Sequence, residues 1–258
     1  MKTPPSATRI NVVIPMAGAG SRFTEAGYAK PKPFIDVNGK PMIVRVVENL
    51  AIDGAHYVLI GRREHAEREP EVVAKLMART DLEFVFIENL TEGTACTVLS
   101  AEAVLDPDIP MVVANSDQLV VGGIANMIDQ AWDAKLDGSI MVFTSPPDPK
   151  WSYAKVDCDG RVLKVAEKVP ISDLATVGVY YISSAKLFSS SARAMIAANE
   201  RVNNEFYTCP VYNYLIAQGG MVGVYEIEPG QMIGLGTPEE LHAYLLSKQL
   251  PSIEDSIL

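Results

Sequence analysis

The sequence predicts an α/β protein built on a doubly wound, mostly parallel β-sheet. Short apolar runs alternate with longer amphipathic stretches through the first part of the 258-residue chain. Each run has the length of a buried strand, and each stretch has the spacing of a helix. Repeated β–α units of this kind form parallel sheets covered by helices on both faces. Ligands of such sheets bind beyond the carboxyl ends of the strands.

The alternation defines the expected elements of the first part. We expect strands at 11–14, 57–60, 83–87, 111–114 and 139–144, and helices at 42–51, 64–78, 94–105 and 124–135. In the first helix the apolar residues that recur at helical spacing are Met42, Ile43, Val46, Val47 and Leu50. Arg45, Glu48 and Asn49 lie on the opposite side, as in a helix that packs on a sheet.

The pattern changes after about residue 145. A proline-rich segment at 146–149 interrupts the β–α order, and an Asp159-Gly160 turn predicts a β-hairpin with strands at 154–157 and 161–167. A strand at 176–182, a helix at 185–198 and a strand at 222–227 are expected to follow. We interpret this part as a small subdomain packed against the same sheet.

A last helix is expected over residues 237–250. Thr237 suits the N-cap, Pro238 the first helical position, and Glu240 the third position of a capping box. The expected organisation is one domain over residues 9–250, divided into 9–145, 146–235 and the helix 237–250.

Composition limits the partners and the compartment. The formal net charge of −10 leaves no basic surplus for phosphate neutralisation, so we expect no nucleic-acid partner. No apolar run approaches the roughly 18 residues that span a bilayer, and residues 1–8 lack the apolar core of a signal peptide. Three scattered cysteines, Cys96, Cys158 and Cys209, predict reduced thiols and a cytoplasmic location. The oligomeric state stays open.

A glycine-bearing loop follows the first expected strand: Ala17, Gly18, Ala19, Gly20 and Ser21. Glycine lets backbone N–H groups approach a ligand closely, which is how such loops hold phosphate oxygens. Arg22 and Lys32 add positive charge beside this loop. The combination predicts a site for nucleoside triphosphates; the alternative is an ordinary strand–helix turn with two surface cations.

Two other phosphate-binding loops do not fit these residues. A Walker A loop requires a Gly-Lys-Ser/Thr run, which the chain lacks. A dinucleotide-binding loop requires Gly-x-Gly-x-x-Gly, but Phe23 stands where the third glycine allows close helix–strand packing.

Two short patterns carry a family resemblance: Gly18-x-Gly20-Ser21-Arg22 and Pro31-Lys32-Pro33. Together they resemble the signature of the sugar-phosphate nucleotidyltransferases, including members of capsule and surface-polysaccharide pathways. The resemblance implies a Rossmann-like, GT-A-like fold with Mg²⁺ as cofactor. Its substrates would be an NTP, held by residues 9–145, and a phosphorylated small molecule, held by 146–235. It implies that residues 17–21 bind the triphosphate, that Arg22 contacts it, and that Lys32 lies near the attacked α-phosphate.

The resemblance also assigns a metal ligand and a base-reading loop. Asp117 follows a buried strand, like the magnesium aspartate of the family; the alternative is a cap of the next helix. Glu92, Gly93 and Thr94 resemble the family's base-reading loop. Their alternative is a helix N-terminus with a favourable acidic residue.

On the acceptor side, Glu167 and Lys168 resemble the element that holds the sugar hydroxyls and the acceptor phosphate. Gly178 resembles the glycine that lets the acceptor lie against the backbone. A solvated ion pair is the alternative for Glu167 and Lys168. The polar run 203–207 either lines the acceptor pocket or forms a solvated loop.

One departure from the family pattern concerns the metal. Many members carry an aspartate two residues before a Gly-Thr pair, as a second magnesium ligand, and Gly234 stands there in this chain. Either Asp117 holds Mg²⁺ with phosphate oxygens and waters, or the acceptor geometry differs. A GT-A glycosyltransferase and a non-catalytic nucleotide-binding regulator remain alternatives, and the base and the acceptor stay open.

Overall fold

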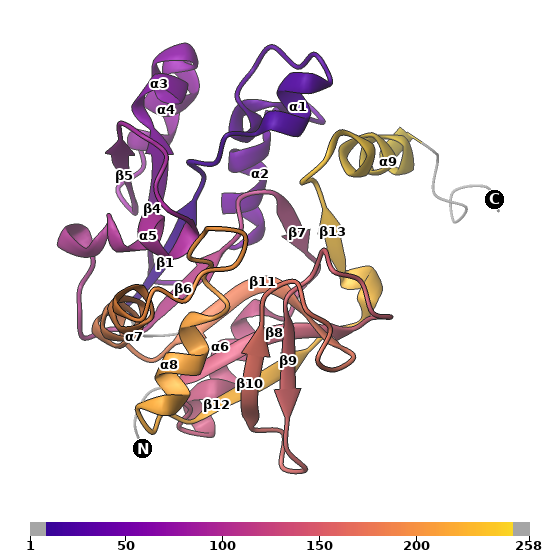
Figure 1. The fold of residues 1–258 in the computed structure, drawn as a ribbon. Helices are drawn as coiled ribbons and strands as arrows, with labels where there is room; N and C mark the ends of the chain where they lie inside the picture. Colours follow the sequence, from indigo (N-terminus) through magenta and orange to yellow (C-terminus); the bar gives the residue numbers. More distant parts are fainter. Residues whose placement is uncertain (1–8, 250–258) are drawn as a thin grey trace.

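The computed structural model describes residues 9–249. Within these residues a nine-stranded sheet forms the centre of the protein (Figure 1). Its strands are β1 (Ile10–Pro15), β4 (Ala55–Arg62), β5 (Leu82–Ile87), β6 (Met111–Ala114), β8 (Gly138–Thr144), β9 (Tyr153–Val156), β10 (Val162–Ala166), β11 (Leu174–Ile182) and β12 (Val222–Glu226). The order is β10-β9-β11-β6-β1-β4-β5, and β8 pairs with β11 and β12.

The half of the sheet around β1 is parallel. β1 pairs in parallel with β4 and β6, and β4 pairs in parallel with β5. β11 runs antiparallel to β6 and β8, whereas β12 runs parallel to β8. Parallel neighbours need crossover connections, which the intervening helices supply. The predicted α/β fold with its doubly wound sheet is confirmed, and the carboxyl ends of β1 and β6 meet at one edge.

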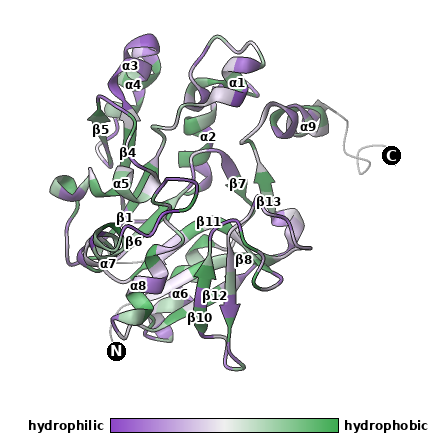
Figure 2. Cartoon of the chain, viewed as in Figure 1, coloured by the Kyte–Doolittle hydropathy of each residue, from purple (hydrophilic) through white to green (hydrophobic). Residues whose placement is uncertain are grey.

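Helices cover both faces of this sheet. The core forms two clusters, one beneath α2 (Met42–Asn49), α4 (Pro70–Met77) and α6 (Ile124–Asp133), the other beneath α5 (Thr94–Leu99), α7 (Ala185–Ala197) and α8 (Val211–Ala217). Val12 packs in the first cluster and Val13 in the second, because successive side chains of a strand point to opposite faces. Figure 2 shows the matching pattern, with hydrophobic strands at the centre and hydrophilic colour on outer helix faces and loops.

The remaining elements are α1 (Ser21–Glu25), η2 (Lys32–Phe34), β2 (Asp36–Val37), β3 (Lys40–Pro41), α3 (Arg63–Arg68), η3 (Glu102–Val104), β7 (Gln118–Val120), η4 (Pro229–Gln231), β13 (Met232–Gly234) and α9 (Pro238–Gln249). β13 pairs antiparallel with β7, so that Gly234 lies opposite Gln118. This pairing brings the C-terminal part of the chain beside the segment that follows β6.

The prediction of a single helix at 64–78 is wrong. The structure has two helices, α3 and α4, with a break at Glu69, whose φ and ψ are −133° and 53°. Pro70 occupies the start of α4. Proline disfavours the helical conformation of the residue before it and has no N–H for the preceding turn, so the first helix ends at this point.

The helix expected at 94–105 is also shorter than predicted. α5 ends at Leu99, and η3 follows as a separate turn. Ser100 N–H donates to the Thr97 carbonyl and Ala101 N–H to the Val98 carbonyl, both at 3.1 Å. These i→i+3 bonds tighten the last turn and end the α-helix.

The capping box predicted for α9 is confirmed. Glu240 N–H donates to Thr237 Oγ1 at 3.2 Å, and Thr237 N–H donates to Glu240 Oε2 at 3.2 Å. Residue 250 of the expected helix and residues 1–8, for which the sequence predicts no signal peptide, lie outside the described residues. None of the helices within 9–249 has both the length and the apolar character that crossing a membrane requires.

Candidate functional site

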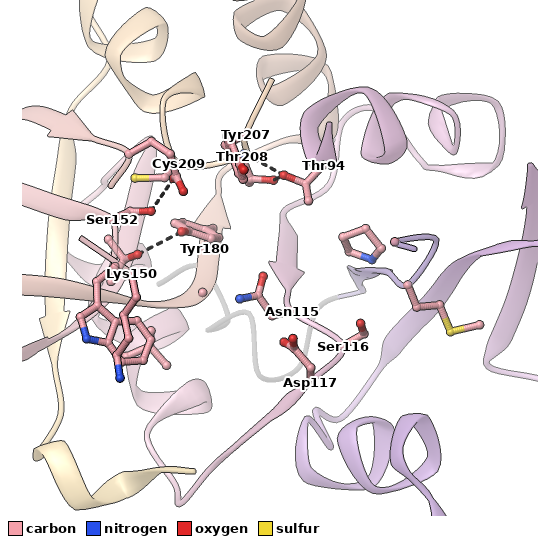
Figure 3. A pocket seen from close by; sticks show the side chains of 18 of the residues that line it. Thr94, Asn115, Ser116, Asp117, Lys150, Ser152, Tyr180, Tyr207, Thr208 and Cys209 are labelled. Atoms are coloured by element: carbon pink, nitrogen blue, oxygen red, sulfur yellow. Dashed lines mark hydrogen bonds between the residues drawn. The ribbon is translucent and has the colours of Figure 1, made fainter. Parts of the chain in front are cut away.

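A cavity of about 430 Å³ lies beyond the carboxyl ends of β1 and β6 (Figure 3). The predicted site residues on its wall are Gly18, Gly20, Arg22, Lys32, Thr94, Asp117, Glu167, Lys168 and Gly178. Figure 3 shows Asn115, Ser116 and Asp117 together in one part of the cavity, with Ser152, Tyr180 and Cys209 gathered in another. The fold thus brings the glycine loop, the candidate metal carboxylate and the candidate acceptor residues to one cavity.

The glycine loop connects β1 to α1. Gly20 has a φ of +64°, a left-handed conformation that favours glycine. A Cβ atom at this position would lie 3.1 Å from Lys32 Cβ, so glycine also lets the loop approach η2. Gly18 has no atom within 4 Å of its Cβ position. Among the described residues the cavity wall does not include Ala17, Ala19 or Ser21, and their predicted role stays a prediction about backbone groups.

Lys32 and Asp117 form an ion pair on the cavity wall. Lys32 Nζ lies 2.5 Å from Asp117 Oδ2, and the two side chains are 20% and 28% exposed. Pro31 precedes η2 and Pro33 lies within it, which restricts the backbone on both sides of Lys32. The residues predicted to meet the α-phosphate and the metal are therefore in contact, although 85 positions separate them in the sequence.

The predicted base-reading loop divides into cavity-lining and packing residues. Thr94 lines the cavity, and its Oγ1 accepts a hydrogen bond from Thr208 N–H at 3.0 Å. The Glu92 side chain instead pairs with Arg201 at 2.9 Å, and its carbonyl accepts from Phe206 N–H. Gly93 has a φ of +130° and lies against the Phe206 backbone. The structure therefore brings only Thr94 of these three residues into the cavity.

Gly93→Ala is expected to destabilise the fold strongly. The new Cβ would lie 2.4 Å from the Phe206 carbonyl oxygen and 2.5 Å from its nitrogen, in a conformation that side chains rarely adopt. Overpacking and backbone strain together predict a loss of roughly 2–5 kcal/mol in the free energy of unfolding. Urea denaturation measures this loss. Gly18→Ala is the matched control, because its Cβ position is open; equal stability of both variants would contradict the packing role of Gly93.

Glu167 is a buried carboxyl group in the acceptor part of the cavity, 8% exposed. The Ser152 hydroxyl donates to Glu167 Oε2. Burial raises the pKa of Glu167, while the Ser152 hydrogen bond and the charge of Lys168 oppose that rise. The alternative of a solvated ion pair does not describe Glu167, because its carboxyl group is removed from water and its hydrogen-bond partner is Ser152.

Glu167→Gln is expected to change how stability depends on pH. Because burial raises the pKa of Glu167, the native protein keeps its proton over a pH range in which the unfolded chain has released it. The stability of the native protein therefore falls as the pH rises above the unfolded value of about 4.5. Glutamine does not titrate, so the stability advantage of the variant, measured by urea denaturation, should grow as the pH rises above about 4.5. Glu88→Gln, at an exposed carboxylate, is the control; an advantage that shrinks with pH would contradict this assignment.

Lys168 and Gly178 occupy special backbone conformations beside Glu167. Lys168 has a φ of +58°, and its Nζ donates to the Tyr207 hydroxyl at 2.7 Å. The same Nζ lies 4.6 Å from the centroid of the Tyr207 ring. Gly178 has a φ of +88°, and a Cβ there would meet Asn115 Nδ2 at 2.2 Å. Gly178 thus makes room for the Asn115 side chain, which lines the cavity.

Several cavity residues were missed by the sequence analysis. These are Lys150, Trp151, Ser152, Thr176, Tyr180, Thr208 and Cys209. Lys150 Nζ lies 4.6 Å from the Trp151 ring centroid, so a cation and an aromatic ring form one rim of the cavity. Lys150 and Trp151 directly follow the proline-rich segment. An aromatic residue in such a loop was the one sequence signal that could have indicated a binding residue there. From the polar run 203–207, Tyr207 lines the cavity, whereas Asn203 and Asn204 are exposed.

Comparison with known proteins gives one family. The family model described as nucleotidyl transferase matches residues 11–211. The catalytic subunit beta of mannose-1-phosphate guanylyltransferase from Drosophila melanogaster is 25% identical over 182 residues, covering 68% of this chain and 48% of that protein. Mannose-1-phosphate guanylyltransferase from Mycobacterium tuberculosis is 22% identical over 238 residues, covering 90% and 62%. The chain thus spans less than two thirds of the length of these relatives.

A solved structure supports the same family over the whole fold. The nucleoside-diphosphate-sugar pyrophosphorylase from Vibrio cholerae RC9 superposes with a TM-score of 0.79 at 27% identity, covering 91% of this chain and 99% of that one. The segment that the family model matches, residues 11–211, contains the glycine loop, Lys32 and Asp117. The chain belongs to the nucleotidyl transferase family.

Proposed function

We propose that this protein joins an NTP to a phosphorylated small molecule and releases pyrophosphate. The observation that carries the proposal is the contact between Lys32 and Asp117 at 2.5 Å, in one cavity with Gly18, Gly20 and Glu167. Nucleotidyl transfer needs donors and cations on the triphosphate, a carboxylate for a metal, and a second subsite for the acceptor. This cavity holds side chains of each kind.

In the proposed reaction an acceptor phosphate oxygen attacks the α-phosphorus of the NTP. A new P–O bond forms as the bond between the α-phosphorus and the bridging oxygen breaks, and pyrophosphate leaves. The Lys32 ammonium would stabilise the negative charge that develops on the α-phosphate oxygens. Arg22 and the N–H groups around Gly18 and Gly20 would hold the triphosphate in line for attack.

The residues around Asp117 fit a magnesium ion. A Cβ atom at Gly236 would lie 2.9 Å from Asp117 Oδ2, so glycine leaves room beside this carboxylate. Residues 9–249 contain no cluster of three or more His, Cys, Asp and Glu side chains suited to a metal. Mg²⁺ tolerates one or two carboxylates because it keeps waters and binds phosphate oxygens. When bound, it would neutralise charge on the triphosphate.

We propose a sugar 1-phosphate as the acceptor. The similar proteins support this class, since two are mannose-1-phosphate guanylyltransferases and the similar solved structure is a nucleoside-diphosphate-sugar pyrophosphorylase. The buried cavity residues Ser152, Thr208 and Glu167 would offer hydrogen-bonding groups for sugar hydroxyls. A cytoplasmic enzyme that supplies precursors of surface polysaccharide fits the family resemblance and the three free cysteines, Cys96, Cys158 and Cys209.

The test is pyrophosphate release with Mg²⁺, one NTP at a time, and a panel of sugar 1-phosphates and non-sugar phosphates. The proposal expects release that requires both one NTP and one acceptor. A glycosyltransferase would release a nucleoside diphosphate from a nucleotide sugar instead. Nucleotide binding by calorimetry without pyrophosphate release from any pair would favour a regulatory homologue and overturn the proposal.

A further inference from the structure

A second carboxylate lies close to Asp117, on the first turn of α9. A Cβ atom at Gly236 would lie 2.9 Å from Asp117 Oδ2 and 3.4 Å from Glu240 Oε2. Both carboxylates therefore approach the same side of Gly236, and the absence of a side chain there is what allows Asp117 to come this close. The pairing of β13 with β7 places this segment beside Asp117, because Leu235 N–H donates to the Asp117 carbonyl at 2.8 Å.

The Glu240 carboxylate also fills the space beside Gly234. A Cβ atom at Gly234 would meet Glu240 Cδ at 2.9 Å, Oε2 at 3.0 Å and Oε1 at 3.1 Å. A side chain at position 234 would thus have to occupy the volume that the Glu240 carboxylate takes. The Glu240 carboxylate can therefore occupy this volume only because residue 234 has no side chain.

The capping hydrogen bonds of Glu240 use only one of its two carboxylate oxygens. Glu240 Oε2 accepts hydrogen bonds from the N–H groups of Gly236 and Thr237, at 3.0 and 3.2 Å. Among the hydrogen bonds of residues 9–249, Oε1 accepts none. The cap uses Oε2, which borders both Gly234 and Gly236, and leaves Oε1, which borders Gly234, without a donor among residues 9–249.

The local charges favour a cation between these groups. Asp117 and Glu240 each carry one negative charge, and Lys32, which contacts Asp117, carries one positive charge. These three groups together carry one net negative charge, beside a cavity that is proposed to take a triphosphate and whose wall also includes Arg22. A divalent cation would balance both the carboxylates and the phosphate oxygens.

We propose that Glu240 supplies the second carboxylate of the magnesium site, in the place that Gly234 leaves open. This inference rests on the proposed function, because it extends the site of Asp117. It answers how Mg²⁺ is held in a chain with glycine at position 234: a residue of the following helix provides the ligand, directly or through a bound water.

The test measures Mn²⁺ binding, with Mn²⁺ alone as the probe and electron paramagnetic resonance as the readout. Glu240→Gln keeps an acceptor for the capping hydrogen bonds but removes the charge. We expect the variant to bind Mn²⁺ at least about tenfold more weakly than the natural protein. Glu239→Gln, at the exposed neighbouring residue, is expected to leave Mn²⁺ affinity unchanged.

A second pair of variants tests the complementarity with Gly234. Glu240→Ala removes the carboxylate and clears the space that an aspartate at 234 would need. We expect Gly234→Asp combined with Glu240→Ala to bind Mn²⁺ more tightly than Glu240→Ala alone. Circular dichroism of each variant separates loss of the metal from loss of the helix.

Two failures are distinguishable. Mn²⁺ affinity that is the same in Glu240→Gln and the natural protein overturns the inference, while pyrophosphate release by the natural protein still supports the function. If the natural protein releases no pyrophosphate with any NTP and acceptor, the proposed function fails, whatever the Mn²⁺ titration gives.

Discussion

Lys32→Ala is expected to lower kcat by about 10²–10³-fold, the effect of removing one preorganised donor from a developing charge. Lys32 lies on the cavity wall, and Pro31 and Pro33 flank it in the chain. Its Nζ lies 2.5 Å from Asp117 Oδ2. A methyl group in its place would leave the charge on the α-phosphate oxygens without this cation. Steady-state rates of pyrophosphate release at saturating substrates measure the loss.

Lys30→Ala is the matched control for this variant. Lys30 is two positions away, but its Nζ pairs with Glu69 at 2.8 Å and its side chain is 51% exposed. Its removal should change kcat little, and an exposed ion pair contributes less than about 1 kcal/mol to stability. Near-normal turnover of Lys32→Ala, with an intact fold by circular dichroism, would remove Lys32 from the mechanism.

Asp117→Asn should cause a loss of similar size, about 10²–10³-fold in kcat. The substitution keeps the shape of the side chain but removes the charge that would hold the metal and that pairs with Lys32. Because the two residues are in contact, the double variant with Lys32→Ala should lose less than the product of the single losses. A pyrophosphate assay over a range of Mg²⁺ concentrations measures each variant.

Asp108→Asn controls for the loss of one carboxylate elsewhere. Asp108 is 71% exposed and pairs with Lys186 on the surface, so its substitution should leave kcat unchanged. If Asp117→Asn kept full activity at every Mg²⁺ concentration, Asp117 would have no part in metal binding.

Most of the fold was predictable because its signals are local. The spacing of apolar residues predicted elements such as the helix that begins at Met42, and the spacing of Thr237 and Glu240 predicted the start of α9. The break at Glu69 was missed although Pro70 marks it, because apolar periodicity continues across the proline. The antiparallel pairing of β11 with β6 and β8 depends on contacts between distant segments, which periodicity does not report.

The candidate site was predictable in part for the same reason. The glycine loop, Lys32 and Asp117 each follow a recognisable pattern, and the topology of parallel strands explains why they meet. Glu92 and Gly93 also matched a pattern, yet their local contacts are with Arg201 and Phe206. These contacts join segments that are far apart in the sequence, and a short motif gives no information about such contacts.

The proximity of Glu240 to Gly234 and Asp117 could not be predicted from the sequence motif. In the sequence, Gly234 stands where many family members carry an aspartate. In space, the Glu240 carboxylate, six residues further along and on the first turn of α9, lies where a side chain at position 234 would begin. Helix α9 presents Glu240 back toward Gly236 through the capping box, an arrangement that the sequence predicts as helix stability. The approach of Asp117 to Gly236 in the folded protein is what connects this cap to the site.

The measurement that tests nucleotidyl transfer most directly follows the α-phosphate of the NTP. The protein is incubated with Mg²⁺, an acceptor phosphate and an NTP labelled at its α-phosphorus, and the products are separated. We predict the label in a product that joins nucleotide and acceptor, with unlabelled pyrophosphate released in equal amount. Label that stays in the NTP, or that appears only in a free nucleoside mono- or diphosphate, would contradict the account.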